Sequence, residues 1–252
     1  MGQAPAAKHA LVVLQLLARH ATPLPAMSIA READIPRSSL YRLLDVLVEQ
    51  GFVTHLRDQH RYGLGLASFE LGSAYTRQQP LRWIARGSLQ RLVAATNEHA
   101  HFALLHGRDV LYVIEERAPG RPPLVTEVGV RLPANLTASG LAILAAMPAR
   151  QVAAIFPSRS AFTRRDGRGP SSPAELRAAL ARARTLRYAE ENGWITPGFA
   201  SVASAVVDHR DHPVGAVAIT FQASQHDPAQ RQALAEHARA AAAEISRSTR
   251  PR

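Results

Sequence analysis

Three short segments in which apolar residues recur at helical spacing, separated by breaks that contain proline, occupy the first fifty residues. They constrain the fold more than any other feature. The first segment has the spacing of an amphipathic helix and ends at residues 22–25. A second helix is expected over residues 26–33. A third is expected from Pro36, at its first position, to about Gln50, where Gly51 supplies a left-handed stop. The residues expected to be buried are Ala10, Val13, Leu14 and Leu17 in the first helix, Met27, Ile29 and Ala30 in the second, and Leu40, Leu43, Leu44, Leu47 and Val48 in the third.

The outward face of the third helix is polar and carries an arginine. The side chains that fall opposite its leucines are Ser38, Arg42, Asp45 and Glu49, with Tyr41 on one flank and Ser39 on the other. Small hydroxyls and an arginine near the start of a helix suit base reading in the major groove, because Arg forks onto guanine and Ser adapts to several base edges. An ordinary amphipathic helix with a solvated face would show the same pattern, so this face alone leaves both interpretations open.

A basic hairpin follows the third helix directly. Residues 52–57 are typical of a strand, residues 58–60 of a turn and residues 61–64 of a returning strand. Such a hairpin after such a helix predicts a winged helix-turn-helix, in which the wing contacts the phosphate backbone or the minor groove and the helix reads sequence. The side chains that we expect to contact DNA are Arg37, Ser38, Ser39, Tyr41, Arg42, Arg57 and Arg61.

Net charge does not locate this surface. The chain carries +10, and 29 of its 30 basic residues are arginines, the exception being Lys8. GC-rich coding produces such a skew, and a positive field also raises affinity for nucleic acid without regard to sequence. Residues 1–63 nevertheless carry only +2, so the prediction of DNA binding depends on pattern.

The composition excludes several classes of protein. Without cysteine the chain forms no disulfide, thiolate metal site or cysteine nucleophile. Its apolar runs are shorter than the roughly 20 residues of a membrane-spanning helix, and its amino terminus does not resemble a secretory signal. We therefore expect a cytoplasmic protein.

Two stretches carry a family resemblance. IPRSSLYRLLDVLVEQGFV and HRYGLGLASFELG occur in the order and spacing seen in the amino-terminal domain of the IclR family of bacterial transcriptional regulators, which the chain resembles over most of its length. Two positions depart from the family pattern: Asp34 stands where glycine is usual in the turn, and Pro25 where a serine cap is common. Asp tolerates a left-handed backbone, so we expect a distorted turn at most.

The remaining sequence predicts an α+β domain. A linker helix over residues 66–77 leads to a boundary at residues 78–80 and a helix at 81–96. Strands are expected at 101–105, 110–115, 124–128, 202–207 and 214–221, a capping box at Ser172 and Glu175 opens a helix to about 186, and a helix capped by Asp227 runs to about 246. Residues 159–170 are expected to form a mobile loop. The domains are then a winged helix-turn-helix at 1–65, a linker helix at 66–79 and, as the resemblance implies, a GAF/PAS-like effector-binding domain at 80–252.

The resemblance also implies an effector pocket. Its first wall is the loop before a helix at 141–146, which supplies Asn135, Thr137, Ala138, Ser139 and Gly140, although a plain helix cap would have the same composition. Its second wall supplies Glu191, Ser201, Ala218 and Thr220. The family commonly has histidine where this chain has Asn135 and lysine where it has Leu141. Trp194 and Ile195 replace acidic residues, which indicates a more apolar or aromatic effector unless Trp194 only packs against the loop.

Metal and enzyme sites are not expected. His99 and His101, or His209 and His212, lack a third ligand at metal-binding spacing, and the chain has no nucleophile elbow and no phosphate-binding glycine motif. We therefore expect no cofactor, and an effector-responsive regulator, repressor or activator, of a catabolic operon. Its partners would be a carboxylate or aromatic effector and a second copy, as a dimer or tetramer on pseudopalindromic DNA. The alternative is a small-molecule sensor whose amino-terminal helices bind another protein.

Overall fold

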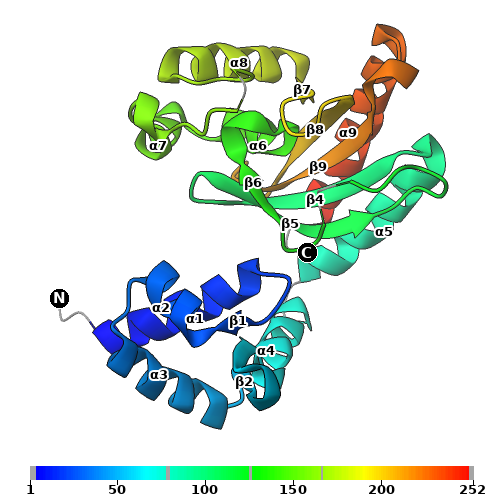
Figure 1. Cartoon of the computed structure of the whole chain (residues 1–252). Helices are drawn as coiled ribbons and strands as arrows, with labels where there is room; N and C mark the ends of the chain where they lie inside the picture. The colour runs from blue at the N-terminus through cyan, green and yellow to red at the C-terminus, as the bar shows by residue number, and fades with distance from the viewer. Residues whose placement is uncertain (1–3, 78–79, 125–126, 166, 250–252) are drawn as a thin grey trace. The chain divides into compact units, whose positions relative to one another are not determined.

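The computed structural model describes residues 4–77, 80–124, 127–165 and 167–249 (Figure 1). The chain divides into two compact units, Met1–Gln79 and Pro80–Arg252. The boundary expected at residues 78–80 falls mainly on residues 78 and 79, which lie outside the described residues.

The first unit is built from helices around a three-stranded sheet of order β1-β3-β2. Its elements are α1 (Pro5–Arg19), β1 (Leu24–Pro25), α2 (Ala26–Ala33), α3 (Arg37–Glu49), β2 (Val53–Leu56), β3 (Arg61–Leu64) and α4 (Leu66–Arg77). The strand β1 was not expected from the sequence; it pairs Leu24 with Tyr62 of β3. Val13, Ile29, Leu40 and Leu44 are almost fully buried and hold α1, α2 and α3 together.

Two left-handed backbone positions follow helices of this unit. Asp34 ends α2 in the left-handed conformation, with φ 52° and ψ 48°, and Gly51 follows α3 with φ 73°.

Two expectations of burial in this unit are wrong. Met27 is 46% exposed because Ala26, Ile29 and Ala30 already form the buried face of α2, and Val48 is 37% exposed because it lies at the edge of the leucine stripe.

The second unit is a six-stranded antiparallel sheet with helices on both faces, which confirms the expected α+β class. The strand order is β6-β5-β4-β9-β8-β7. The strands are β4 (His99–His106), β5 (Asp109–Glu116), β6 (Arg131–Pro133), β7 (Ala189–Asn192), β8 (Phe199–Val207) and β9 (Pro213–Gln222). The helices are α5 (Pro80–Thr96), α6 (Ala138–Ala146), α7 (Ala149–Ile155), α8 (Pro173–Leu186) and α9 (Pro228–Ser248).

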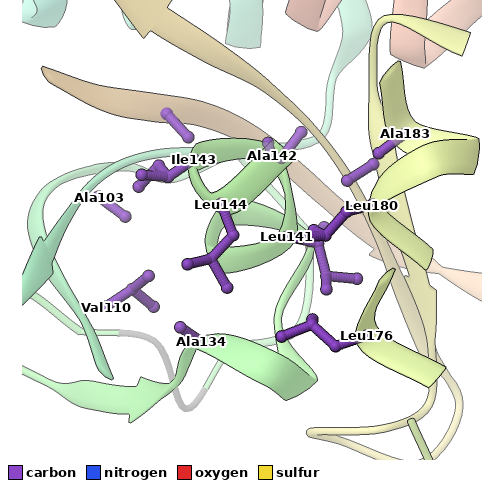
Figure 2. Close-up of a cluster of buried hydrophobic side chains, with 14 of the residues drawn as sticks. Ala103, Val110, Ala134, Leu141, Ala142, Ile143, Leu144, Leu176, Leu180 and Ala183 are labelled. Carbon is purple, nitrogen blue, oxygen red and sulfur yellow. The ribbon is translucent and has the colours of Figure 1, made fainter. Parts of the chain in front are cut away.

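Each face of the sheet has its own hydrophobic core. Helices α5 and α9 cover one face, where Leu89, Ile219 and Ile245 are fully buried. Helix α6 packs on the other face and α8 packs on α6. Figure 2 shows Leu141, Ile143 and Leu144 of α6 between the strands and Leu180 of α8. Small residues on β8 and β9 bring α6 close to the sheet, and this proximity sets the geometry of the site described below.

Three local expectations for this unit are wrong. The described residues of 124–128 form no strand, because the chain turns at Gly129, whose φ is 92° and whose N–H bonds to Tyr112 O. Helix α6 begins at Ala138 instead of 141, because Thr137 Oγ1 caps it by accepting from Gly140 N–H at 3.1 Å. The box at α8 is only half formed: Ser172 caps the helix, but the Glu175 carboxylate accepts from Ser171 N–H.

The segment expected to be a mobile loop, residues 159–170, is largely exposed but is anchored to the core at several described positions. Phe162 is buried beside Phe156, with ring centroids 4.9 Å apart. Asn135 Nδ2 donates to Thr163 O and to Pro170 O, both at 2.9 Å. These contacts fix both halves of the segment to the core next to α6.

Candidate functional site

The polar face of α3 is fully available to a partner. Arg37, Ser38, Ser39 and Arg42 are exposed, and Tyr41 is 48% exposed. Within the described part of the chain, none of these five side chains forms a hydrogen bond or ion pair. The buried leucines on the opposite side fix the helix, so its free donors project from a rigid support.

The two arginines of the hairpin behave differently. Arg57 is exposed at the tip between β2 and β3. Arg61 is half-buried, and its Nη1 donates to Pro23 O at 2.9 Å, so it fastens the hairpin to the segment before α2. His55 stacks on Tyr62 across the same hairpin, with ring centroids 4.3 Å apart. Arg57 is therefore the hairpin arginine free to contact a phosphate, while part of the donor capacity of Arg61 serves the fold.

The second unit encloses a narrow cavity of about 20 Å³ between α6 and the sheet. Seven of the nine expected effector contacts line it: Thr137, Ala138, Ser139, Glu191, Ser201, Ala218 and Thr220. Six further lining residues are Tyr112, Leu124, Leu132, Ile195, Thr196 and Phe199. Of these six, Ile195 was singled out in the sequence, and Leu132 and Thr196 lie in the two stretches that the sequence assigned to the pocket.

One wall of the cavity is a hydrogen-bonded row across three strands. Register places Glu191 of β7, Ser201 of β8 and Thr220 of β9 side by side. Ser201 Oγ donates to Glu191 Oε1 at 2.8 Å and lies 3.0 Å from Thr220 Oγ1. Trp194 N–H donates to Glu191 Oε2 at 3.0 Å. Burial raises the pKa of Glu191, although these hydrogen bonds to its carboxylate act in the opposite direction.

The opposite wall is the first turn of α6. Ser139 is 1% exposed, and its Oγ has no well-formed hydrogen bond with any described residue. Burial also raises the pKa of Tyr112, and its interaction with Ser139 offsets part of that rise. The amides at the start of a helix and the Ser139 hydroxyl together favour an anionic or strongly accepting group.

Two expected contacts lie outside the cavity. Asn135 is buried at 1% exposure and directs its amide to the segment before α8. Gly140 packs against Ala134, where a Cβ would lie 2.2 Å from the Ala134 carbonyl oxygen. Both residues hold the loop before α6 in place and do not face the cavity.

The two residues that replace acidic positions also differ. Ile195 lines the cavity, whereas Trp194 does not. Its ring lies against Gly169, where a Cβ would approach it to 2.9 Å. Trp194 therefore packs against the loop, and the apolar character of the cavity comes from Ile195 together with leucines and Phe199.

The paired histidines have structural partners. His99 Nδ1 accepts from Ala118 N–H at 3.2 Å, and Nε2 lies 2.9 Å from Pro122 O. His101 is fully buried, and burial lowers its pKa to about 3, so it is neutral at physiological pH. In the ranges that the structure describes, no group of three or more His, Asp or Glu side chains is placed to hold a metal ion, and no helix is long and apolar enough to cross a membrane.

Comparison with known proteins assigns both parts of the chain to one family. The description "IclR helix-turn-helix domain" matches residues 6–57, and "Bacterial transcriptional regulator IclR C-terminal" matches residues 73–247. The chain belongs to the IclR family of bacterial transcriptional regulators. It is an effector-responsive DNA-binding regulator, as the sequence predicted, with a winged helix-turn-helix ahead of an α+β sensor domain.

The similarity to individual relatives extends over most of their lengths. The chain is 32% identical to the glycerol operon regulatory protein of Streptomyces coelicolor, covering 84% of this chain and 83% of the relative. It is 26% identical to the regulator XynR of Escherichia coli, covering 96% and 95%. Among solved structures, an IclR homolog of Microbacterium hydrocarbonoxydans complexed with 4-hydroxybenzoate has a TM-score of 0.80 at 25% identity, covering 97% and 98%.

Proposed function

We propose that this IclR-family regulator binds a small hydroxylated carboxylic acid in the cavity between α6 and the sheet. The observation that carries the proposal is the row Glu191–Ser201–Thr220 opposite the start of α6. The amides at the start of α6 and the Ser139 hydroxyl would donate hydrogen bonds to the carboxylate, because a helix N-terminus attracts negative charge. The row of strand side chains would bind the hydroxyl, and the apolar residues that line the cavity would cover the body of the ligand.

The size of the cavity makes binding and conformational change inseparable. A space of about 20 Å³ is close to what one water molecule needs. An acid of this class fits only if the segments around the cavity move apart, so it binds an expanded arrangement more tightly than the closed one. A ligand that distinguishes two arrangements of a protein shifts their populations, which is the requirement for control of DNA binding.

A ligand screen by thermal shift tests this proposal. The screen contains 4-hydroxybenzoate, benzoate and short aliphatic hydroxy acids, each measured against the wild type. We expect a hydroxylated acid to raise the melting temperature, and Ser139→Ala and Glu191→Gln to abolish the rise while DNA binding is kept. Asn192→Ala, at an exposed neighbouring position on β7, is the matched control and retains the response. A rise that survives both pocket substitutions would contradict this location.

On the DNA side, we propose that α3 reads base edges through Arg42 with Ser38 and Ser39, flanked by Arg37 and Tyr41, while Arg57 contacts the backbone. Arg42→Ala should then lower specific binding by about 1–3 kcal/mol. Arg19→Ala, at the exposed end of α1, removes the same charge and serves as control. The measurement is a gel shift on the DNA upstream of the gene, at fixed salt and against random duplex. Equal affinities of the Arg42 and Arg19 variants would exclude the base-reading role.

We propose residues 1–65 as the DNA-binding head, 66–79 as the linker and 80–252 as the sensor. Two copies, or four, would bind a pseudopalindrome in a catabolic operon, with half-sites centred about 34 Å apart. This activity requires a cytoplasmic location, and we assign no catalysis to the cavity. Light scattering measures the number of copies, and footprinting measures the spacing of the half-sites. Binding to DNA without sequence preference would instead favour the alternative function, a sensor that acts through protein contacts.

A further inference from the structure

The positive charge of the second unit is concentrated in one segment. Residues 149–187 contain nine arginines and two acidic residues, a net charge of +7. The rest of the unit, residues 80–148 and 188–252, contains 13 arginines and 12 acidic residues, a net charge of only +1. A coding bias that favours arginine over lysine explains the residue type but not this separation of charge along the chain.

These arginines are exposed, and most lack an acidic partner. All nine are exposed: Arg150, Arg159, Arg164, Arg165, Arg168, Arg177, Arg182, Arg184 and Arg187. Arg182 forms an ion pair with Glu190. The other eight arginines form no ion pair with any described residue. Elsewhere in the unit, by contrast, Arg86, Arg91, Arg117, Arg121 and Arg239 each pair with a glutamate. The segment therefore keeps most of its positive charge unpaired.

One hydrophobic core holds the segment together. Val152 of α7, Phe162 of the connecting loop and Leu176 of α8 are buried in the same cluster as α6. Figure 1 shows α7 and α8 as a layer beyond α6, on the side away from the strands. An isolated backbone bridge pairs Arg165 with Arg168, and Arg168 Nη1 also donates to Gly193 O. We call the exposed side of residues 149–187 the arginine face.

We propose that the arginine face binds the phosphate backbone of duplex DNA, independently of sequence and in addition to the contacts of α3. Residues 1–65 carry a net charge of only +2, so the head supplies little of the long-range attraction that brings a protein to DNA. Residues 149–187, which carry the arginine face, have a net charge of +7. Guanidinium groups contact phosphate oxygens through a planar pair of donors, and each phosphate neutralised releases counterions.

The salt dependence of non-specific DNA binding tests this proposal. The probe is a fluorescent 40-base-pair duplex of random sequence, titrated with the full chain between 50 and 200 mM KCl. The variant Arg164→Gln/Arg177→Gln changes two exposed side chains that form no hydrogen bond with any described residue. We expect the slope of log K against log salt to become less steep by about 2, close to one for each phosphate that the variant no longer neutralises.

A matched control separates a local effect from total charge. Arg210→Gln/Arg247→Gln removes the same charge from exposed positions outside the arginine face and should leave the slope unchanged. Circular dichroism checks that both variants fold. Equal slope changes in the two variants, or no change in either, would overturn the proposal.

A third titration separates DNA from an acidic protein as the partner. If poly-L-glutamate binds the wild type but not the Arg164/Arg177 variant, and the DNA slope is the same in both, the face recognises acidic protein and the proposal is wrong. Arg42→Ala is measured in parallel. It should reduce the preference for the upstream DNA without reproducing the effect of the arginine-face variant, so failure of either contact is visible separately.

Discussion

Glu191 accepts hydrogen bonds from Ser201 Oγ and from the amide of Trp194 while only 6% exposed. Burial raises its pKa above the ordinary value of 4.5. The folded state therefore binds the proton more tightly than the unfolded state does. The resulting stabilisation is complete below about pH 4.5 and is lost as the pH rises through the raised pKa. In Glu191→Gln this loss is absent, so the variant should gain stability relative to the wild type as the pH rises above 4.5.

Urea unfolding at pH 4.5, 6 and 7.5, followed by tryptophan fluorescence, measures this difference. A gap between the two proteins that does not change with pH would mean that the carboxyl titrates alike in the folded and unfolded chains. Asn192→Gln, at the neighbouring exposed position, should show no pH-dependent gap.

Asn135 shows why residue type alone did not identify its role. Its position in the loop before α6 suggested a ligand contact, but both of its described hydrogen bonds go to backbone oxygens of the segment before α8. Asn135→Ala should lower the free energy of unfolding by about 1–3 kcal/mol, because the carbonyls of Thr163 and Pro170 lose their donor. Asn192→Ala should change it by less than about 0.5 kcal/mol. Denaturant unfolding measures both, and an Asn135 variant of unchanged stability that no longer responds to a ligand would restore the original assignment.

At the scale of elements, the sequence predicted what local chemistry determines. Helices α2 and α4 begin and end where expected, because proline, the left-handed Asp34 and the apolar spacing are all local signals. The two-residue strand β1 had no such signal, since one of its residues is proline and its pairing depends on Tyr62. The cavity was only partly predictable for the same reason: sheet register brings Tyr112 and Phe199 to it from distant parts of the chain.

The turn between α2 and α3 depends on the left-handed backbone of Asp34. Asp34 adopts a φ of 52°, which a β-branched residue adopts only under strain. Asp34→Val should therefore cost about 1–2 kcal/mol and speed hydrogen exchange in α2 and α3. Asp34→Gly, the residue usual in the family, should exchange no faster than the wild type. Arg31→Val is the control for helix propensity, and exchange equally fast in both valine variants would show that the backbone conformation is not the cause.

At the scale of the whole molecule, the closed cavity and the exposed α3 face belong to units that must be coupled if an effector is to control DNA binding. The coupling free energy is reciprocal: an effector that changes the affinity for DNA by a given factor has its own affinity changed by DNA by that same factor. The acid identified by thermal shift should therefore show two dissociation constants, measured with and without a saturating operator duplex, whose ratio equals its effect on DNA affinity. Typical couplings correspond to factors of about 5–150, which calorimetry resolves.

Ser139→Ala should weaken effector binding both with and without DNA, since it removes a group that binds the ligand. A substitution in the linker helix α4 should instead leave binding without DNA intact and bring the ratio toward one. If the two ratios differ in the wild type, the acid acts on DNA binding by a route other than this cavity.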